Sequence, residues 1–448
     1  MMQLLPWILI GFLAVFLSLR SFRWGLILYL IIALIFPAQW FGELSLRFEL
    51  VYLLWLVFVF FMHKSISDST FVWHSVLSTY VLFLMLIILS TTLALISNLS
   101  EGSLTQLITP FYGILRPLLV LCLFLNAPVD EKFPKLFLWA VVWLNIPIAL
   151  LSLGQSLRFG IAQEITLKGY TSPWRTPVFF YLEEGDQYFR SVGVFESPIY
   201  NAIFSLIVLV TIVILLVNKY TLYRQIILYI SFSFALLAGI TTSSSTFILG
   251  LVVISGFFLI FFGLGCIRRF YRIALAVICV VGILFFITMP QLAEIPRLSN
   301  GLHYQAHRIQ TCSVFESRYD SSSGAFANTF QAIIERPILG WGLTKVEGAF
   351  VGDSIYIVTL YRVGMVGLAL WLFLVILILK CSWSCRKNQG VFGDICWLVF
   401  LITLLLSATG VGAASFFLPR IQEWYWALVG ISLNPNLRET SIQERKLE

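Results

Sequence analysis

Long runs of apolar residues alternate with short polar connections along most of this 448-residue chain. About thirteen such runs can be counted, with approximate centres at residues 12, 32, 56, 85, 117, 143, 208, 231, 253, 280, 367, 403 and 425. One helical crossing of a bilayer needs about 20 apolar residues, whereas barrel strands alternate in polarity at every second position. The pattern therefore predicts an all-α fold, a polytopic transmembrane helical bundle of about 12–14 spans.

Two of the apolar runs differ from the rest. The run from Leu50 to Met62 is short for one crossing, so it either spans the membrane or enters and leaves on one side. The first run, from Leu4 to Leu19, has no basic residue before it and no small-residue cleavage site after it. It is therefore interpreted as a retained helix rather than as a signal peptide.

Two polar stretches interrupt the pattern, at residues 155–199 and 290–353. Lys and Arg gather in alternate connections between the runs, which the positive-inside rule places in the cytoplasm. Both polar stretches then lie on the extracytoplasmic side, while the side of the N-terminus depends on the number of spans. The predicted order is N-terminal membrane helices at 1–154, a loop at 155–199, central membrane helices at 200–289, a large loop at 290–353, C-terminal membrane helices at 354–433 and a cytoplasmic tail at 434–448.

The composition narrows the class of protein. Hydrophobic residues make up 59% of the chain and charged residues only 11%, whereas soluble proteins carry about 25% charged residues. In a membrane protein the formal net charge of +7 belongs to cytoplasmic connections, so it does not indicate nucleic acid as a partner. Cys381 and Cys385 lack the second Cys or His pair that a zinc site requires, so neither a metal nor another cofactor is predicted.

The segment Arg190-Ser-Val-Gly193-Val-Phe-Glu196-Ser-Pro198 stands at the entrance to the apolar run centred near residue 208. Pro198 suits the first turn of a helix, where amide groups have no intrahelical partner. Such a helix start favours an anion such as phosphate, and the charge of Arg190 adds to that preference. Glu196 is a candidate proton acceptor. The alternative is an ordinary capped helix with an arginine that extends to the membrane surface.

The large polar stretch also contains residues that can do chemistry. It ends with Arg336-Pro-Ile-Leu-Gly-Trp341-Gly, which predicts a tight turn with an exposed tryptophan, a common surface for sugar faces. Asp353 follows at the membrane boundary, where partial burial would raise its pKa and make it a general base. The alternative is that Asp353 caps the next helix. His303 and His307 are either further proton acceptors or structural residues.

Three arginines lie inside apolar runs, namely Arg116, Arg362 and Arg420. A charged group at membrane depth is costly unless it is paired or faces a wet cavity, so such residues indicate function by default. Arg420 has Glu423 three residues later on the same helical face, so a structural ion pair explains it equally well. Arg116 and Arg362 are predicted to line a polar cleft.

Three patterns together resemble the bacterial O-antigen ligase/polymerase family. They are Arg-x-x-Gly-x-Phe-x-x-Pro at 190–198, Arg-Pro-x-x-Gly-x-Gly at 336–342, and Asp-Ser-x-Tyr at 353–356 followed by Gly-Met-Val-Gly at 364–367. The resemblance implies a membrane glycosyltransferase of cell-envelope polysaccharide biosynthesis, such as that of lipopolysaccharide. It further implies a donor oligosaccharide linked to undecaprenyl diphosphate, a site at the outer face of the bacterial inner membrane, and arginines that hold the diphosphate without a metal.

Carried onto this sequence, the resemblance places Arg190 and, by a looser match, Arg318 at the diphosphate. A diphosphate is a good leaving group once its developing charge is neutralised, so arginines supply most of what the reaction needs. We predict that the catalytic residues are Asp353, Arg190, Arg318 and Glu196, and that the substrate-binding residues are Arg336, Trp341, Tyr356, Arg116, Arg362, His303 and His307.

Two departures from the family pattern bear on the acceptor. The ligase branch usually has His where this chain has Asp353, and Ser-Arg where this chain has Thr242-Ser-Ser-Ser245, so both departures favour a repeat-unit polymerase. An O-antigen ligase or a protein O-oligosaccharyltransferase is the alternative enzyme. A lipid-linked oligosaccharide flippase or another transporter is the non-enzyme alternative, which the absence of a visible repeat disfavours. Expected partners are the lipid-linked donor, membrane lipid and, for a polymerase, a chain-length regulator and a flippase.

Overall fold

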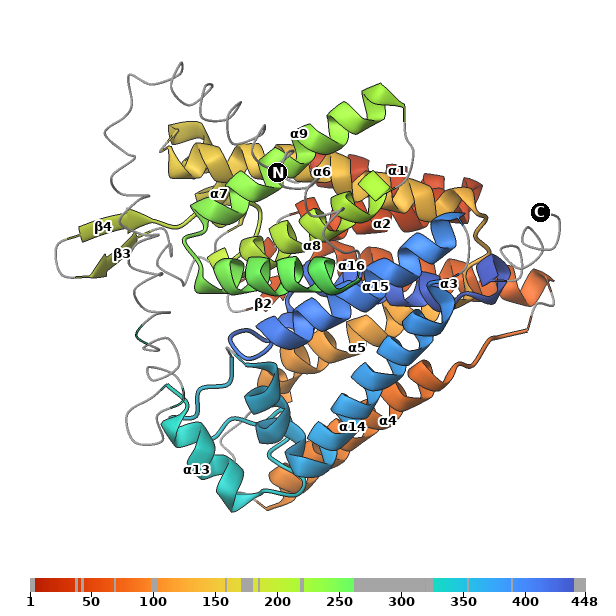
Figure 1. Cartoon of the computed structure of the whole chain (residues 1–448). Coiled ribbons are helices and arrows are strands. Elements are labelled where there is room, and N and C mark those ends of the chain that lie inside the picture. The colour runs from red at the N-terminus through yellow and green to blue at the C-terminus, as the bar shows by residue number, and fades with distance from the viewer. Residues whose placement is uncertain are drawn as a thin grey trace. The chain divides into compact units, whose positions relative to one another are not determined.

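In the residues that it describes, the computed structural model consists of helices, two short hairpins and their connections (Figure 1). It describes residues 5–36, 39–41, 44–67, 70–97, 104–157, 159–170, 180–183, 186–217, 221–261, 311, 319, 325–352, 354–387 and 390–438. In chain order, the helices of the first 241 residues are α1 (Leu5–Arg20), α2 (Phe22–Ile35), α3 (Phe48–Ser67), α4 (Ser75–Ile96), α5 (Leu104–Asn126), α6 (Lys132–Ser156), α7 (Gly160–Gly169), α8 (Pro198–Val217) and α9 (Leu222–Thr241). Next come a helix at Ser245–Phe261, then α13 (Ala327–Glu335), α14 (Ile355–Cys385), α15 (Gly390–Thr409), the 3-10 turn η2 (Ser415–Phe417) and α16 (Ile421–Leu433).

The helix lengths confirm a polytopic helical membrane protein. Within the described residues, eight helices are long and apolar enough to cross a membrane, namely α3, α4, α5, α6, α8, α9, α14 and α15. Three shorter apolar helices, at Ile10–Arg20, Phe22–Ile35 and Ser245–Phe261, correspond to further predicted runs. The run at Leu50 to Met62 belongs to the 20-residue α3 and is therefore long enough to span. The run predicted near residue 280 lies outside the described residues.

The two predicted loops contain structure of their own. The stretch 155–199 includes α7 and an antiparallel hairpin of β3 (Phe180–Glu183) and β4 (Asp186–Phe189), in which Phe180 lies opposite Phe189. The stretch 290–353 includes α13. A second hairpin, β1 (Gln39–Phe41) with β2 (Leu44–Leu46), precedes α3. The division of the chain into loops and spans by side of the membrane stays a prediction.

The chain forms two compact units. Unit 1 comprises Met1–Gln39, Ser45–Phe137 and Phe315–Glu448, and unit 2 comprises Trp40–Leu44 and Leu138–Val314. In unit 1, α16 packs on α5, and α14 packs on both α4 and α15 (Figure 1). Helices in lipid gain mainly from close packing, and here aromatic rings provide it. Trp371 lies 5.3 Å from Phe83 and 5.2 Å from Phe416, and Tyr80 lies 4.9 Å from Trp426 between ring centroids.

In unit 2, α8 is buried along almost its whole length and packs on α9. A polar contact holds α6 to α9, because Asn145 Nδ2 donates to the carbonyl oxygen of Ser231 at 2.8 Å and to its hydroxyl at 3.0 Å. The Ser231 hydroxyl donates in turn to the carbonyl oxygen of Val142 at 3.0 Å. Buried amide and hydroxyl groups thus satisfy each other within the apolar packing.

Candidate functional site

The long helix α14 is broken at Gly364, which has the non-helical angles φ 62° and ψ −162°. A break leaves backbone groups without helical partners, and the segment 337–342 supplies them. Trp341 N donates to Tyr361 O at 2.8 Å, and Gly342 N donates to Arg362 O at 2.7 Å. On the other side of the break, Met365 N donates to the carbonyl oxygen of Pro337 at 2.8 Å. Irregular backbone is tolerated at membrane depth when protein satisfies it, and this segment does so.

The plug segment, residues 337–342, approaches α14 so closely that side chains have no room. A Cβ atom on Gly364 would lie 2.2 Å from the Ile338 carbonyl oxygen, and one on Gly340 would lie 2.5 Å from Tyr361 O. Both glycines also have positive φ, which L side chains rarely adopt. Helix α4 holds the other side of the plug, where the Ser90 hydroxyl donates to Leu339 O at 2.5 Å. The tight turn predicted from this motif therefore serves to complete a broken membrane helix.

We expect Gly364→Ala to destabilise the protein by more than the backbone angle alone requires. Gly390 offers a matched control, since its φ of 73° is similar but a Cβ there meets nothing within 4 Å. Gly390→Ala should cost only the left-handed backbone penalty of about 1–2 kcal/mol. Gly364, with φ 62° and ψ −162°, lies in a region essentially restricted to glycine, so Gly364→Ala adds a larger backbone penalty and a clash with the plug. The measurement is the melting temperature of the full-length protein in detergent, and equal losses for the two variants would contradict the plug.

Arg362 lies two residues before the break, on a membrane-spanning helix. Its side chain is partly exposed, and its guanidinium makes no hydrogen bond or ion pair with any residue in the described part of the chain. An arginine at membrane depth normally pairs with a polar group or faces a wet cavity. Arg362 is therefore a candidate for binding an anionic ligand.

Arg336 and Trp341 contact each other, but they do not form an exposed surface on which a sugar ring could stack. The Arg336 guanidinium lies 4.5 Å from the centroid of the Trp341 ring and donates to the hydroxyl of Ser97 at the end of α4. Trp341 is only 2% exposed and donates through Nε1 to Ala332 O at 2.7 Å. The expectation of an exposed tryptophan is wrong, because this ring packs in a core with Ala332, Ala94 and Tyr361.

The start of α14 is fixed against the end of α15. Ile355 N donates to Gly410 O at 2.9 Å, and the Tyr356 hydroxyl donates to Ser407 O at 2.7 Å. The N-cap position of α14 belongs to Ser354. Tyr356 is therefore held in place by the protein. Asp353 lies outside the described residues, as do Arg318, His303 and His307, so their predicted roles stay predictions.

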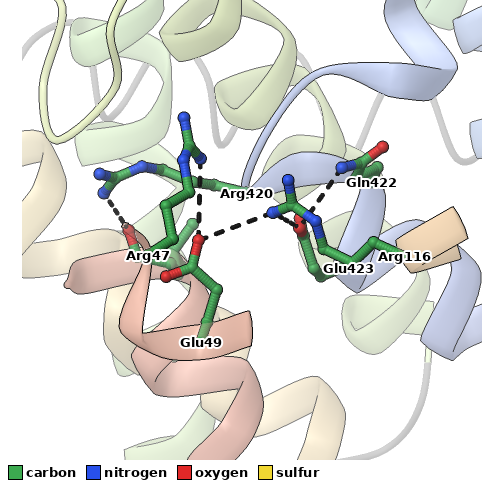
Figure 2. A network of polar contacts seen from close by, with 7 residues as sticks. Arg47, Glu49, Arg116, Arg420, Gln422 and Glu423 are labelled. Atoms are coloured by element: carbon green, nitrogen blue, oxygen red, sulfur yellow. Dashed lines mark hydrogen bonds and ion pairs between the residues drawn. The ribbon is translucent and has the colours of Figure 1, made fainter. Parts of the chain in front are cut away.

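A buried network of charges occupies another part of unit 1 (Figure 2). Arg116 of α5 pairs with Glu423 of α16, and its Nη1 lies 3.6 Å from Glu49 Oε1 at the start of α3. Arg47 approaches the same Glu49 oxygen at 3.7 Å. Arg420 donates to the carbonyl oxygen of Leu34 in α2 at 3.0 Å. The network thus connects four helices through their backbone or side chains.

This network changes the interpretation of Arg116. Its side chain is 3% exposed, its partners are internal carboxylates, and it lies 4.6 Å from the Tyr112 ring centroid. Arg116 is thus paired rather than facing a cleft, so its place in the membrane is explained without a ligand. The sequence pattern indicated only Arg420 as a partner for Glu423, whereas in the structure Arg116 lies between Glu423 and Glu49. The available signal was the position of Glu49 beside an apolar run.

In unit 2 the Arg190 motif folds against the turn that follows α9. Arg190 Nε donates to Thr242 O at 3.1 Å. The next residue, Ser191, donates its backbone N–H to Thr241 O at 3.0 Å, and the two hydroxyls lie 2.8 Å apart. The backbone of the motif is therefore fixed beside the turn at 242–245, where the sequence departs from the ligase pattern. Arg190 and Thr242 are 52 residues apart along the chain.

Gln155, at the end of α6, organises the same motif, and sequence reasoning missed it. Its Oε1 accepts from the backbone N–H groups of Val192 and Gly193, each at 2.9 Å, and its Nε2 donates to Gly193 O at 2.9 Å. A Cβ on Gly193 would lie 2.9 Å from the Ser152 hydroxyl, which also accepts from Asn201 Nδ2 at 3.0 Å. The glycine of the motif is thus required by close packing.

The turn beside Arg190 is rich in buried hydroxyl groups. Thr242, Ser243 and Ser244 are each at most 2% exposed, and Ser243 has a positive φ of 44°. The Ser243 hydroxyl finds no hydrogen-bond partner among the described residues. A guanidinium beside hydroxyl donors can bind phosphate or sugar oxygens, and a strained serine with an unused hydroxyl is typical of a functional turn.

The end of the motif agrees with the sequence prediction in one respect. Pro198 is the first residue of α8, as expected for the first turn of a helix. Glu196 lies two residues earlier and is partly exposed. Its position next to the helix start leaves its predicted role as a proton acceptor open to test.

Comparison with known proteins gives one partial similarity. No protein-family model matches the chain. A Pseudomonas aeruginosa (strain PAO1) protein named O-antigen ligase is 31% identical over 116 residues, which cover 24% of this chain and 27% of that protein. The chain thus aligns with about a quarter of that relative's length. This partial match supports a likeness to the O-antigen ligase/polymerase family and nothing more specific.

Proposed function

We propose that this protein is a membrane glycosyltransferase that polymerises polysaccharide repeat units. It would transfer a growing glycan from undecaprenyl diphosphate to an incoming repeat unit at the outer face of a bacterial inner membrane. The observation that carries the proposal is Arg190, held against the hydroxyl-rich turn at Thr242–Ser244 in a motif that resembles this family. The partial similarity to an O-antigen ligase supports the same class of enzyme.

The proposed reaction needs charge neutralisation and one proton transfer. The bond between the anomeric carbon and the diphosphate oxygen breaks, and the bond to the acceptor hydroxyl oxygen forms. Undecaprenyl diphosphate leaves with the electron pair, and Arg190, with the nearby hydroxyl donors, would stabilise its negative charge. The acceptor hydroxyl loses its proton to a base, for which Asp353 and Glu196 are the candidates.

Arg362 and the plug segment, which belong to unit 1, offer a separate candidate for binding a lipid-linked anion. An arginine without a described partner, next to a helix break, suits a lipid-linked anion that approaches from the bilayer. Arg336 would act through its contact with Trp341 and Ser97, which fixes the plug. We therefore propose Arg362 as a residue that binds the donor and Arg336 as a positioning residue.

An O-antigen ligase is the second candidate, favoured by the name of the similar Pseudomonas protein. Asp353 and the turn Thr242-Ser-Ser-Ser245 replace the His and Ser-Arg that the ligase branch usually has, which supports polymerase. The two activities share a donor and differ in the acceptor. A polymerase extends the lipid-linked glycan, whereas a ligase moves the glycan to another molecule.

Gene deletion followed by gel analysis of surface polysaccharide separates these functions. A polymerase mutant should lose the long ladder and keep a band with a single attached repeat, whereas a ligase mutant should lose all attached repeats. Complementation with the wild-type gene is the control. An unchanged polysaccharide pattern in the deletion strain would contradict both activities.

A further inference from the structure

A cavity of about 510 Å³ lies in unit 1. None of the residues that line it belongs to the plug segment or to the charge network. It is bordered by the start of α2, the ends of α3 and α5 and the chain just after α16. Lys64 and His63 contribute basic groups to its lining, and Asn126 and Asn436 contribute amides. Phe60 and Leu125 add apolar surface. The cavity has no part in the function proposed above.

The walls of this cavity are fixed by two asparagines. Asn126 accepts from Val72 N at 2.7 Å through Oδ1 and donates to Val72 O at 3.2 Å, so the extended chain before α4 is held like a strand. Asn434 donates to Phe124 O at 3.0 Å and Ala127 O at 2.9 Å, which fastens the end of α16 to the end of α5. The cavity is therefore part of the packed structure and does not result from a loose loop.

Positive charge is held at this cavity. The Lys64 ammonium donates to Thr70 O and lies 5.7 Å from the Phe60 ring centroid and 5.6 Å from that of Phe71. Within the described part of the chain, the Thr70 carbonyl accepts one of the three ammonium protons, which leaves two for an oxygen-rich anion. By sequence, the helix ends and connections at this end of unit 1 carry basic residues at Arg20, Arg23, Lys132, Lys135 and Arg438 and fewer acidic ones, at Asp68, Asp130 and Glu131.

An apolar surface leads along α3 to this charge. Val51, Leu54, Phe58, Phe61 and Met62 are between 50% and 56% exposed. Their spacing of three or four residues places them on one face of α3, and that face ends two residues before Lys64. A chain of hydrocarbon lying on this face would bring a polar group at its end next to the ammonium.

We propose that the cavity binds a phosphate-bearing headgroup, with Lys64 as the residue that pairs with the phosphate. Basic pockets between membrane helices recognise anionic lipid headgroups through this chemistry. An anionic phospholipid supplies the phosphate together with acyl chains for the exposed face of α3. Free inorganic phosphate offers the same anion without the chains, and the experiment distinguishes the two.

The test is native mass spectrometry of the full-length protein, delipidated in detergent, with added phosphatidylglycerol, phosphatidylcholine or inorganic phosphate. Phosphatidylglycerol should bind in preference to phosphatidylcholine, and Lys64→Gln should lower its occupancy about fivefold, as loss of one cation at a membrane surface predicts. Lys132→Gln is the matched control, because Lys132 is exposed at the same end of unit 1 but does not line the cavity. Thr70→Trp, at an exposed position of the wall, should also reduce binding by filling the cavity.

Each outcome decides the proposal. Loss of phosphatidylglycerol in Lys64→Gln and Thr70→Trp, with retention in Lys132→Gln, supports a lipid headgroup. Binding of inorganic phosphate with the same dependence on Lys64 supports the phosphate site with the free ion as its source. Equal occupancy by the two lipids without phosphate binding, equal losses in both lysine variants, or unchanged binding in Thr70→Trp would overturn it. None of these results depends on glycosyltransferase activity.

Discussion

An Arg190→Ala variant is expected to leave a strain without a polysaccharide ladder, even when the protein reaches the membrane at its normal level. The Arg190 guanidinium is held at Thr242 O beside buried hydroxyl groups, where it would stabilise the charge of a departing diphosphate. Removing one such preorganised donor typically lowers a rate by about 10²–10³-fold. A loss of this size would leave single repeats in place of long chains.

Two further variants make the Arg190 result specific. Arg190→Lys keeps the charge but loses the planar fork that matches phosphate, so it should retain only part of the ladder. Arg224→Ala removes an exposed cation from α9 in the same unit and should leave the ladder unchanged. The measurements are gel analysis of surface polysaccharide and immunoblotting of the membrane fraction. A full ladder from Arg190→Ala at normal protein levels would exclude Arg190 from the reaction.

Replacing Arg116 by methionine is expected to destabilise the fold strongly. The change removes the cation that pairs with Glu423 and one of the cations beside Glu49, and these two carboxylates are 0% and 2% exposed. Breaking a buried pair by removing one member costs about 3–5 kcal/mol, because the remaining charge stays buried without compensation. The melting temperature of the purified protein in detergent, together with the amount of folded protein in the membrane, measures this effect.

A salt bridge near the surface provides the matched control. Arg23 Nη1 and Asp130 Oδ2 are separated by 2.7 Å, but these side chains are 31% and 51% exposed. Arg23→Met should therefore cost at most about 1 kcal/mol. The double variant Arg116→Met with Glu423→Leu should recover much of the stability, because it removes both members of the buried pair. Equal destabilisation by Arg116→Met and Arg23→Met would show that the network contributes little.

The candidate sites were only partly visible in the sequence. The motif at Arg190 and the hydroxyl-rich turn at Thr242–Ser245 each stood out, but nothing local indicated that they touch or that Gln155 holds the motif. The same holds for the plug, where glycine and proline predicted a tight turn. The partner of that turn, the backbone of α14 at its break, became visible only in the fold.

The sequence by itself determined the membrane helices and the class of protein. A backbone in lipid must satisfy its own hydrogen bonds, so an apolar run of sufficient length has almost no alternative to a helix. Only the tertiary structure decided which polar groups are free and which are paired. It buried Trp341 under Arg336, joined Arg116 to Glu423 across 307 residues, and left Arg362 without a described partner. The hydrophobic pattern indicates whether each segment lies in lipid or in water. The partner of a buried charge depends instead on which helices become neighbours.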